Sequence, residues 1–153
     1  MYPIQLNLAH KHVVIIGGGK IAWRKLSNLL TEPCTVDVVS PKFHDAFQVL
    51  QSSEQLRLIR EPYHKSHLKH ADLIIIATND PQTNNQVALD ASPSQWINHT
   101  GDKTQSDFFN MLTIQHDELT ISISSNGQNI ERTKRYAAKI KSFLTADEED
   151  MHE

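Results

Sequence analysis

The sequence predicts an α/β protein, in which a parallel sheet with helices on both faces is followed by a small β-hairpin plus helix. Three observations support this fold class. Apolar, β-branched runs alternate with helical patterns up to about residue 103, which is typical of a parallel sheet covered on both faces. A run of glycines follows the first of these strands. Beyond that region the alternation stops, and two alternating apolar segments around a polar turn predict a hairpin.

Each element of the first part has its own signal. Short apolar runs predict the strands, and Ser40-Pro41 ends the second one because proline discourages strand pairing. Asp80 is a good N-cap and Pro81 suits the first position of a helix. In chain order we expect strands at 13–16, 35–39, 56–59, 73–77 and 96–98, and helices directly after the glycines, around 43–50 and over 81–91.

The last third of the chain predicts a separate unit. Segments 111–115 and 119–124 form the hairpin, a basic amphipathic helix follows over 130–144, and the acidic end is expected to be disordered. A hairpin and one helix bury little surface by themselves, so a second copy of the chain is the expected partner. The predicted organisation is residues 1–103 for cofactor binding, 104–146 for dimerisation in a homodimer and 147–153 as a tail.

The glycine run carries the main functional signal. Gly17, Gly19 and Ala22 match the pattern G-x-G-x-x-A between a strand and a helix, which is the dinucleotide-binding turn of a Rossmann-type fold. Gly17 permits the tight turn and Gly19 a close approach to a pyrophosphate, whose charge the N–H groups around Lys20 and Ile21 stabilise. The alternative is that the glycines only make a sharp connection between the strand and the helix.

Two further segments are candidates for cofactor binding. An NAD site commonly has an acidic residue at the end of the second strand, where this chain has Ser40, Pro41 and Lys42. Ser40 can bond a ribose hydroxyl, and Lys42 either tolerates the extra phosphate of NADP or is simply a solvated loop lysine. Thr78, Asn79 and Asp80 follow the fourth strand, where the second half of a dinucleotide crosses the sheet. We expect NAD as the cofactor, although the sequence does not decide between NAD and NADP.

Composition excludes several classes of protein. Hydrophobic residues make up 39% and charged residues 22% of the chain, which is enough apolar material for a core. No apolar stretch approaches the length of a membrane span and no signal peptide begins the chain, so a cytoplasmic protein without membrane contact is expected. The net charge is −3 and no strongly basic face is visible, which argues against a nucleic-acid partner. The single cysteine agrees with a reducing compartment.

Together these residues resemble the precorrin-2 dehydrogenases and the N-terminal region of siroheme synthases. The matching segments are 3–8, 17–25, 38–41, 77–81 with Asn84, 98, 107–108 and 119–127. The resemblance implies a Rossmann domain with a dimerisation unit and NAD-dependent oxidation of the tetrapyrrole precorrin-2 to sirohydrochlorin. It also implies insertion of ferrous iron, giving siroheme, as a second activity. Basic residues that are candidates for binding the substrate carboxylates are Arg24, Lys25, Arg132, Lys134 and Arg135.

The chain departs from this family at its implied acid. Members commonly have an acidic residue three positions after Asn98, where this sequence has Gly101, with Asp102 one place later. Asp102 is therefore the candidate acid/base, unless it is an ordinary loop aspartate or His99 takes over, since imidazole titrates near neutral pH. Ser125 is a third candidate catalytic residue, or alternatively a turn-forming serine.

Other functions stay open from the sequence alone. His64, His67 and His70 recur every third residue, but on a helix the third drifts off the shared face, so no metal site is predicted. One alternative function is a nucleotide-sensing Rossmann regulatory module without turnover. Another is a chelatase that lacks dehydrogenase activity.

Overall fold

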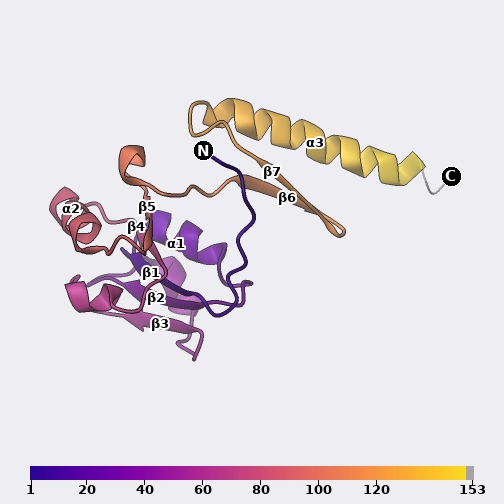
Figure 1. The fold of residues 1–153 in the computed structure, drawn as a ribbon. Coiled ribbons are helices and arrows are strands. Elements are labelled where there is room, and N and C mark those ends of the chain that lie inside the picture. Colours follow the sequence, from indigo (N-terminus) through magenta and orange to yellow (C-terminus); the bar gives the residue numbers. More distant parts are fainter. Residues whose placement is uncertain (151–153) are drawn as a thin grey trace. The chain divides into compact units, whose positions relative to one another are not determined.

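The structure is a computed structural model that describes the backbone of residues 1–150 and the side chains of residues 1–146. Contacts divide the chain into two units, Ile4–Phe108 on the one hand and Met1–Pro3 with Phe109–Glu153 on the other. Figure 1 follows the chain through both units from indigo to yellow. We describe each unit by itself.

The unit Ile4–Phe108 is built on a five-stranded parallel sheet with the strand order β3-β2-β1-β4-β5. This order and the parallel pairing confirm the predicted Rossmann-type sheet (Figure 1). The apolar runs form these strands because both sides of each central strand are buried. The strands are β1 (His12–Ile16), β2 (Thr35–Val39), β3 (Leu56–Ile59), β4 (Leu73–Ile76) and β5 (Trp96–His99).

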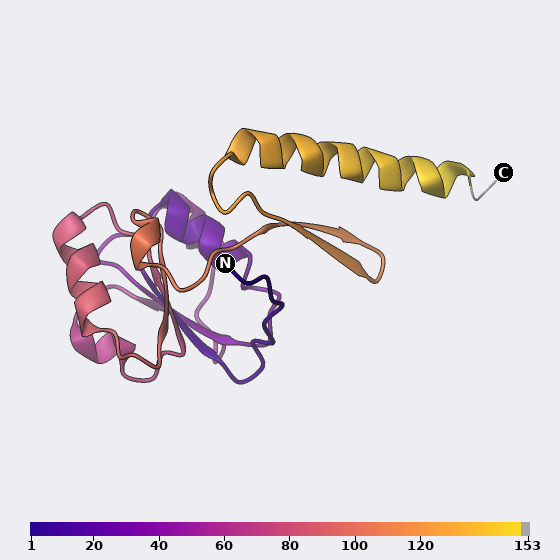
Figure 2. The same cartoon turned by 45° about the horizontal axis from the view of Figure 1, so that its top comes forward.

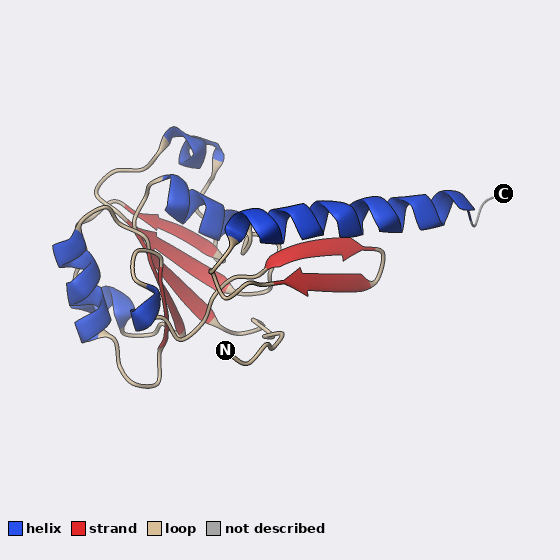
Figure 3. Cartoon of the chain, turned by 90° about the horizontal axis from the view of Figure 1, so that it is seen from above, coloured by secondary structure: helices blue, strands red, loops and turns tan. Residues whose placement is uncertain are grey.

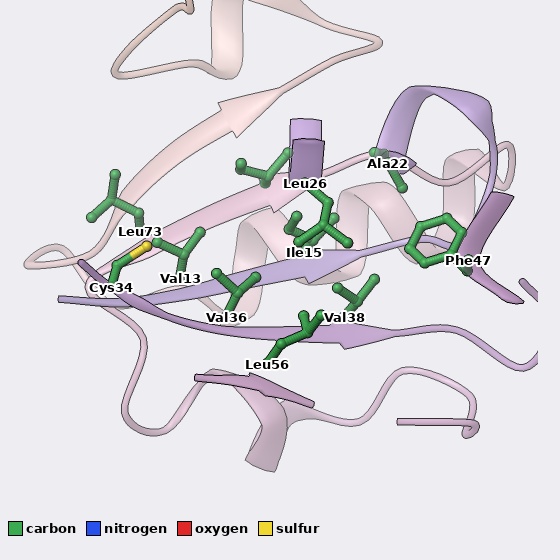
Figure 4. Packing of buried hydrophobic residues seen from close by; sticks show 12 residues of the cluster. Val13, Ile15, Ala22, Leu26, Cys34, Val36, Val38, Phe47, Leu56 and Leu73 are labelled. Atoms are coloured by element: carbon green, nitrogen blue, oxygen red, sulfur yellow. The ribbon is translucent and has the colours of Figure 1, made fainter. Parts of the chain in front are cut away.

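Alternate residues of the strands form two apolar clusters, one on each face of the sheet. Val13 and Ile15 of β1 pack with Ala22 and Leu26 from helix α1 (Lys20–Ser27), as the close view in Figure 4 shows. The neighbouring β1 residues point the other way and share a cluster with Val87 of helix α2 (Pro81–Asp90). Helices therefore cover both faces, as expected (Figure 3).

Short 3-10 helices make the remaining connections in this unit. They are η1 (Asp45–Val49), η2 (Lys65–Leu68) and η3 (Lys103–Gln105). The helix expected around residues 43–50 is η1, which is shorter than predicted and buries only Phe47. A segment that buries one side chain lacks the repeated apolar contacts that would stabilise a longer helix.

The strand order contains one reversal point, between β1 and β4. β1 pairs with β2 on one side and with β4 on the other, so the chain reverses its direction of winding between β1 and β4. In open α/β sheets ligands bind at the carboxyl ends of the strands beside this reversal. The glycine turn follows β1 directly and lies at this edge.

The second unit consists of an antiparallel hairpin and one long helix. Strands β6 (Leu112–His116) and β7 (Leu119–Ile123) pair, and the turn between them includes Asp117 with a φ of 48°. Helix α3 (Ile130–Asp150) lies along the hairpin (Figure 2) and contacts β6. Ile114 and Ala137 are buried. The hairpin and the helix were both predicted.

The helix runs to Asp150 and therefore past Leu144, where the apolar pattern predicted its end, so it includes the first residues of the expected tail. The segment after Leu144 contains no glycine or proline that would stop a helix. The rest of the predicted tail, residues 151–153, lies outside the described residues. Among the described residues, no helix combines the length and the apolar character needed to cross a membrane.

Candidate functional site

The first two glycines of the turn are required by close packing. Gly17 has a φ of +129°, and a Cβ atom there would overlap the carbonyl oxygen of Ala77, which follows β4. A Cβ atom on Gly18 would overlap the carbonyl oxygen of Lys42 and the side chain of Ser40. Only glycine fits such positions, because any side chain would displace the neighbouring backbone. The role of Gly18 was not predicted, although three consecutive glycines were a signal for it.

Gly19 differs from Gly17 and Gly18, because the space in which its Cβ atom would lie is open. Among the described residues, no heavy atom outside its chain neighbours lies within 4 Å of a Cβ built on Gly19. Gly19 is the N-cap of α1, has no side-chain capping bond, and precedes a first turn without acidic residues. The first N–H groups of a helix lack partners within the helix and favour anions. The turn therefore fits the pyrophosphate of a dinucleotide.

The residues after Gly19 differ in exposure. Lys20 and Ile21 are exposed and Ala22 is fully buried against the sheet. The small side chain of Ala22 lets α1 approach β1 closely, which agrees with the reason given for the third position of the pattern.

Residues 40–42, which follow β2, pack against the glycine turn. The Ser40 hydroxyl donates a 2.6 Å hydrogen bond to the carbonyl oxygen of Lys42, and Ser40 is buried beside Gly18. Pro41 and the Lys42 side chain are exposed. The donated proton holds the 40–42 turn, which leaves the Ser40 oxygen able to accept a bond and not to donate a second one.

Thr78 and Asp80 are tied to the start of α2. The Thr78 hydroxyl donates to Oδ1 of Asn84 at 2.6 Å, and Nδ2 of Asn84 donates to the Thr78 carbonyl oxygen at 3.1 Å. Asp80 caps α2, as predicted, by accepting bonds from the Gln82 and Thr83 N–H groups. The Thr83 hydroxyl and these N–H groups lower the pKa of Asp80. Asn79 is exposed between them. The role of Asn84 was not predicted, since sequence alone does not show its partner.

The His99 ring is held by the backbone of the loop after β5. His99 is only 5% exposed, and its Nδ1 accepts bonds from the N–H groups of Gly101 at 3.2 Å and Asp102 at 2.9 Å. The ring proton of neutral His99 therefore sits on Nε2, because Nδ1 must supply its lone pair to these donors.

Both oxygens of the Asp102 carboxylate also accept hydrogen bonds. One oxygen accepts from the Thr104 N–H at 2.9 Å and hydroxyl at 2.6 Å, and the other accepts from Nε2 of Gln105 at 2.9 Å. The Thr104 hydroxyl, Gln105 and the Thr104 N–H, in that order, lower the pKa of Asp102 to about 2. Asp102 thus caps η3 as an ionised carboxylate and is a weak base.

Gly101 and Asn98 complete the surroundings of this loop. A Cβ on Gly101 would lie 3.4 Å from Cε1 of His99, which is an ordinary contact, so the loop has room for a side chain there. Nδ2 of Asn98 donates to the Phe108 carbonyl oxygen at 2.8 Å, while its buried Oδ1 has no partner among the described residues.

Ser125 belongs to the second unit. Its hydroxyl oxygen accepts bonds from the Asn129 N–H at 3.1 Å and from the Thr133 hydroxyl at 3.0 Å, which ties the turn after β7 to the first turn of α3. The guanidinium groups of Arg132 and Arg135 lie 5.8 Å and 5.9 Å from the ring centre of Tyr136. A pocket of about 500 Å³ is lined by Asn129, Glu131, Arg132 and Arg135.

The other three candidates for binding the substrate carboxylates lie on helices, Arg24 and Lys25 on α1 and Lys134 on α3. Arg24 and Lys134 are exposed, and Lys25 is half-buried. Burial and the nearby Arg24 charge lower the pKa of Lys25 to about 8.

The histidine-rich segment serves to cap η2. Nδ1 of His67 accepts from the His64 N–H at 3.0 Å, and Nε2 of His67 lies 3.5 Å from the Glu61 carboxylate. Within the part of the chain that the structure describes, no group of three His, Cys, Asp or Glu residues is arranged to hold a metal ion.

The parallel sheet and its open glycine turn define a Rossmann-type dinucleotide-binding protein. Comparison with known proteins agrees with this class. The chain belongs to the family of putative NAD(P)-binding proteins, which its residues 4–111 match. This membership agrees with the nicotinamide cofactor predicted from the glycine pattern.

Individual relatives confirm the resemblance seen in the sequence. The chain is 27% identical over 147 residues to a precorrin-2 dehydrogenase of Bacillus subtilis (strain 168), covering 96% of this chain and 91% of that protein. It is 32% identical over 143 residues to a siroheme synthase of Pseudoalteromonas translucida, covering 93% of this chain but only 30% of that longer protein. The solved structure of SirC, a precorrin-2 dehydrogenase, matches with a TM-score of 0.82 and 27% identity, over 93% of this chain and 70% of SirC.

Proposed function

We propose that this chain is an NAD-dependent oxidoreductase that oxidises precorrin-2 to sirohydrochlorin in siroheme biosynthesis. The observation that carries the proposal is the open N-terminus of α1 behind Gly19, at the carboxyl ends of the paired strands β1 and β4. The relatives supply the substrate class, because precorrin-2 dehydrogenases and siroheme synthases match nearly the whole chain. The reaction removes a hydride and a proton from the tetrapyrrole.

The chain's contribution to cofactor binding is mainly its backbone. Bound NAD supplies the nicotinamide carbon that accepts the hydride. The N–H groups at the start of α1 hold the pyrophosphate, and the absence of side chains at 17, 18 and 19 allows the approach. The proposed set of cofactor-binding residues is Gly17, Gly19, Lys20, Ile21, Ala22, Ser40, Pro41, Lys42, Thr78, Asn79 and Asp80.

Asp102 is proposed to act through its charge. Loss of a hydride leaves the substrate positively charged, and an ionised carboxylate stabilises such a charge without needing to take the proton, which leaves the substrate to water. A pKa of about 2 keeps Asp102 ionised throughout the neutral range and makes it a weak general base. His99 then positions Asp102 by holding its N–H group, and Ser125 remains a proposed contact of the substrate.

We also propose that the chain works as a homodimer. In the second unit, Phe143 is 68% exposed and Ile130 62% exposed on α3, and Leu119 of β7 is exposed as well. A two-stranded sheet with one helix is marginally stable in water, and a second copy would cover these apolar side chains.

One assay tests the main proposal. Purified protein is incubated anaerobically with precorrin-2 and NAD, and the absorbance of sirohydrochlorin and of reduced nicotinamide is followed. The expected result is the appearance of both products in equal amounts. Tight binding of NAD without any turnover would favour a regulatory module, and the absence of NAD binding would leave only a chelatase.

Iron insertion is a second proposed activity, and Gly101 provides its test. Gly101 has room for a side chain, so Gly101→Asp should fold normally while restoring the carboxylate that the family resemblance implies. We expect this variant to insert ferrous iron into sirohydrochlorin at least tenfold faster than the unsubstituted chain, because chelation needs a base to remove pyrrole protons, and such catalysis is worth about 100-fold or more.

The uncharged variant Gly101→Asn is the matched control. Equal iron insertion by the Asp and Asn variants and the unsubstituted chain would show that a carboxylate at this position does not serve chelation.

A further inference from the structure

Asn84 is a buried polar residue near the start of α2. Only 8% of it is exposed, and both polar atoms of its side chain bond to one residue, Thr78. Its Oδ1 accepts the Thr78 hydroxyl at 2.6 Å, and its Nδ2 donates to the Thr78 carbonyl oxygen at 3.1 Å. Because a buried polar atom without a partner is costly, these two bonds hold Thr78 at its hydroxyl and at its backbone together.

The bond to Asn84 uses the hydroxyl proton of Thr78. That proton is directed to Oδ1 of Asn84 at 2.6 Å, with the Asp80 carbonyl oxygen farther away at 3.1 Å. The hydroxyl oxygen also accepts from the Asp80 N–H at 3.0 Å. A hydroxyl has a single proton to donate, so the Thr78 side chain has no donor left for a ligand. Its backbone can still donate.

Two backbone donors after β4 are without a partner. Neither the Thr78 N–H nor the Asn79 N–H donates a hydrogen bond to any residue that the structure describes. The N–H groups on either side are bonded, that of Ala77 to the Ile16 carbonyl oxygen and that of Asp80 to the Thr78 hydroxyl. Thr78 is half-buried and Asn79 is exposed, so their N–H groups are available to water or to a ligand.

The same backbone lies against the glycine turn. A Cβ atom on Gly17 would overlap the Ala77 carbonyl oxygen and would lie 3.1 Å from the Thr78 nitrogen. Rossmann-type sheets bind a dinucleotide across the point where the strand order reverses, with one nucleotide on each side. A pyrophosphate held at Gly19 therefore places the adenosine half on the side of β2 and the nicotinamide half on the side of β4.

We infer that Asn84 is a positioning residue for the cofactor. By holding Thr78, it presents the Thr78 and Asn79 N–H groups to the nicotinamide half of the bound dinucleotide, which Asn84 itself does not touch. The inference rests on the proposed function, which requires a dinucleotide at the glycine turn. Binding groups need supporting hydrogen bonds to stay in the productive geometry, and the bonds from Asn84 supply that support.

A comparison of NAD with ADP tests the inference by equilibrium binding. ADP carries the adenosine and the pyrophosphate without the nicotinamide half, so it does not use the donors after β4. In Asn84→Ala we expect NAD to bind about tenfold more weakly, whereas the affinity for ADP should change less than twofold. Calorimetric titration measures both. A general defect of the fold would weaken the two ligands equally.

Asn85→Ala is the matched control. Asn85 is the next residue of α2, is exposed, and makes no side-chain hydrogen bond to any of the described residues. The same substitution at this position should therefore change neither affinity.

A double-mutant cycle shows whether Asn84 acts through Thr78. Thr78→Val keeps the shape of the side chain and removes the hydroxyl that bonds to Asn84. We expect this variant to weaken NAD binding about tenfold by itself. The double variant should bind NAD only about 10- to 30-fold more weakly than the unsubstituted chain, well below the roughly 100-fold loss that independent effects would give.

The amide signals give a direct readout in the unsubstituted chain. Addition of NAD should move the amide proton signals of Thr78 and Asn79 downfield in NMR spectra, because these N–H groups gain an acceptor. ADP should leave both signals in place. In Asn84→Ala the shift on addition of NAD should be reduced or lost.

The outcomes separate this inference from the proposed function. Equal changes of the NAD and ADP affinities in Asn84→Ala, no change in either, or independent effects of the two substitutions would overturn the inference alone. So would NAD binding that leaves the amide signals of Thr78 and Asn79 unmoved, which needs no variant and decides even if Asn84→Ala does not fold. Failure of the unsubstituted chain to bind NAD would overturn the proposed function and the inference with it.

Discussion

The three glycines at positions 17–19 should tolerate substitution very differently, although their sequence context is the same. Gly17 combines a positive φ with direct contact to the Ala77 carbonyl oxygen, whereas Gly19 faces open space. The fold therefore requires the first glycine, whereas we propose that ligand binding requires the third. Sequence pattern alone assigned both to the same motif.

We predict that Gly19→Val abolishes dinucleotide binding while leaving the melting temperature nearly unchanged, because the new side chain fills only space that the pyrophosphate would occupy. Gly17→Ala should instead lower the free energy of unfolding by roughly 1–3 kcal/mol, since it introduces strain and a backbone overlap. Thermal unfolding and calorimetric titration of NAD check the pair. Retained tight binding in Gly19→Val would contradict the pyrophosphate assignment.

The lowered pKa of Asp102 predicts how the stability of η3 depends on pH. Hydrogen bonds hold its pKa at about 2 in the folded chain, below the value of about 3.9 of an unperturbed aspartate. The bonds to Thr104 thus stabilise η3 fully above about pH 4, and this contribution is lost as the pH falls toward 2. The amide proton shift of Thr104, followed by NMR, should titrate with a midpoint well below 3.9.

The low pKa of Asp102 also affects the pH dependence that we expect for binding and turnover. Neither binding nor turnover should show a step between pH 5 and 8 that disappears in Asp102→Asn, because Asp102 stays ionised across this range. A step that vanishes in this variant would show that Asp102 accepts the proton after all.

At the scale of an element, a side chain fixes the geometry of the loop between β5 and η3. His99 accepts two backbone bonds from Gly101 and Asp102 and thereby sets the course of the loop. We propose that His99 acts as a positioning residue, because its Nδ1 lone pair already accepts these two bonds.

We predict that His99→Asn keeps most of the activity, since the Asn Oδ1 can replace Nδ1 as the acceptor, whereas His99→Ala lowers kcat about tenfold or more through loss of the loop geometry. Steady-state kinetics over pH 5 to 8 provide the measurement. Equal losses in both variants, with a changed pH profile, would indicate that the imidazole itself takes part in the chemistry.

At the scale of the whole molecule, the exposed apolar surface of the second unit bears on the oligomeric state. Its exposed apolar residues on α3 and β7 have no cover among the described residues of one chain. We predict that the double variant Phe143→Asp with Leu119→Asp is monomeric, because burying two carboxylates in an apolar interface costs several kcal/mol. Sedimentation velocity measures the effect.

Leu89→Asp is the control for that experiment. Leu89 is 80% exposed on α2 in the other unit, so its replacement adds one carboxylate to a surface outside the second unit. A monomeric unsubstituted chain, or equal behaviour of all variants, would contradict the proposed homodimer.

Much of this architecture follows from local sequence patterns. The apolar runs specify the parallel strands because both faces of each must be buried, the glycines after β1 specify the sharp turn, and Asp80-Pro81 specify the start of α2. The alternation at 112–123 specifies the hairpin in the same way. These features depend on residues close together in the chain, so the sequence by itself determines them.

Only the tertiary structure decided which atoms meet across the fold. Three contacts show this: the close approach of Lys42 to Gly18, the two bonds to His99 Nδ1 and the position of Arg60 over Phe43. They depend on how β2 lies between β1 and β3 and on how the loop folds back after β5. Hydrogen bonds and cation contacts act over a few ångströms in space, and a spacing along the chain does not reveal that distance.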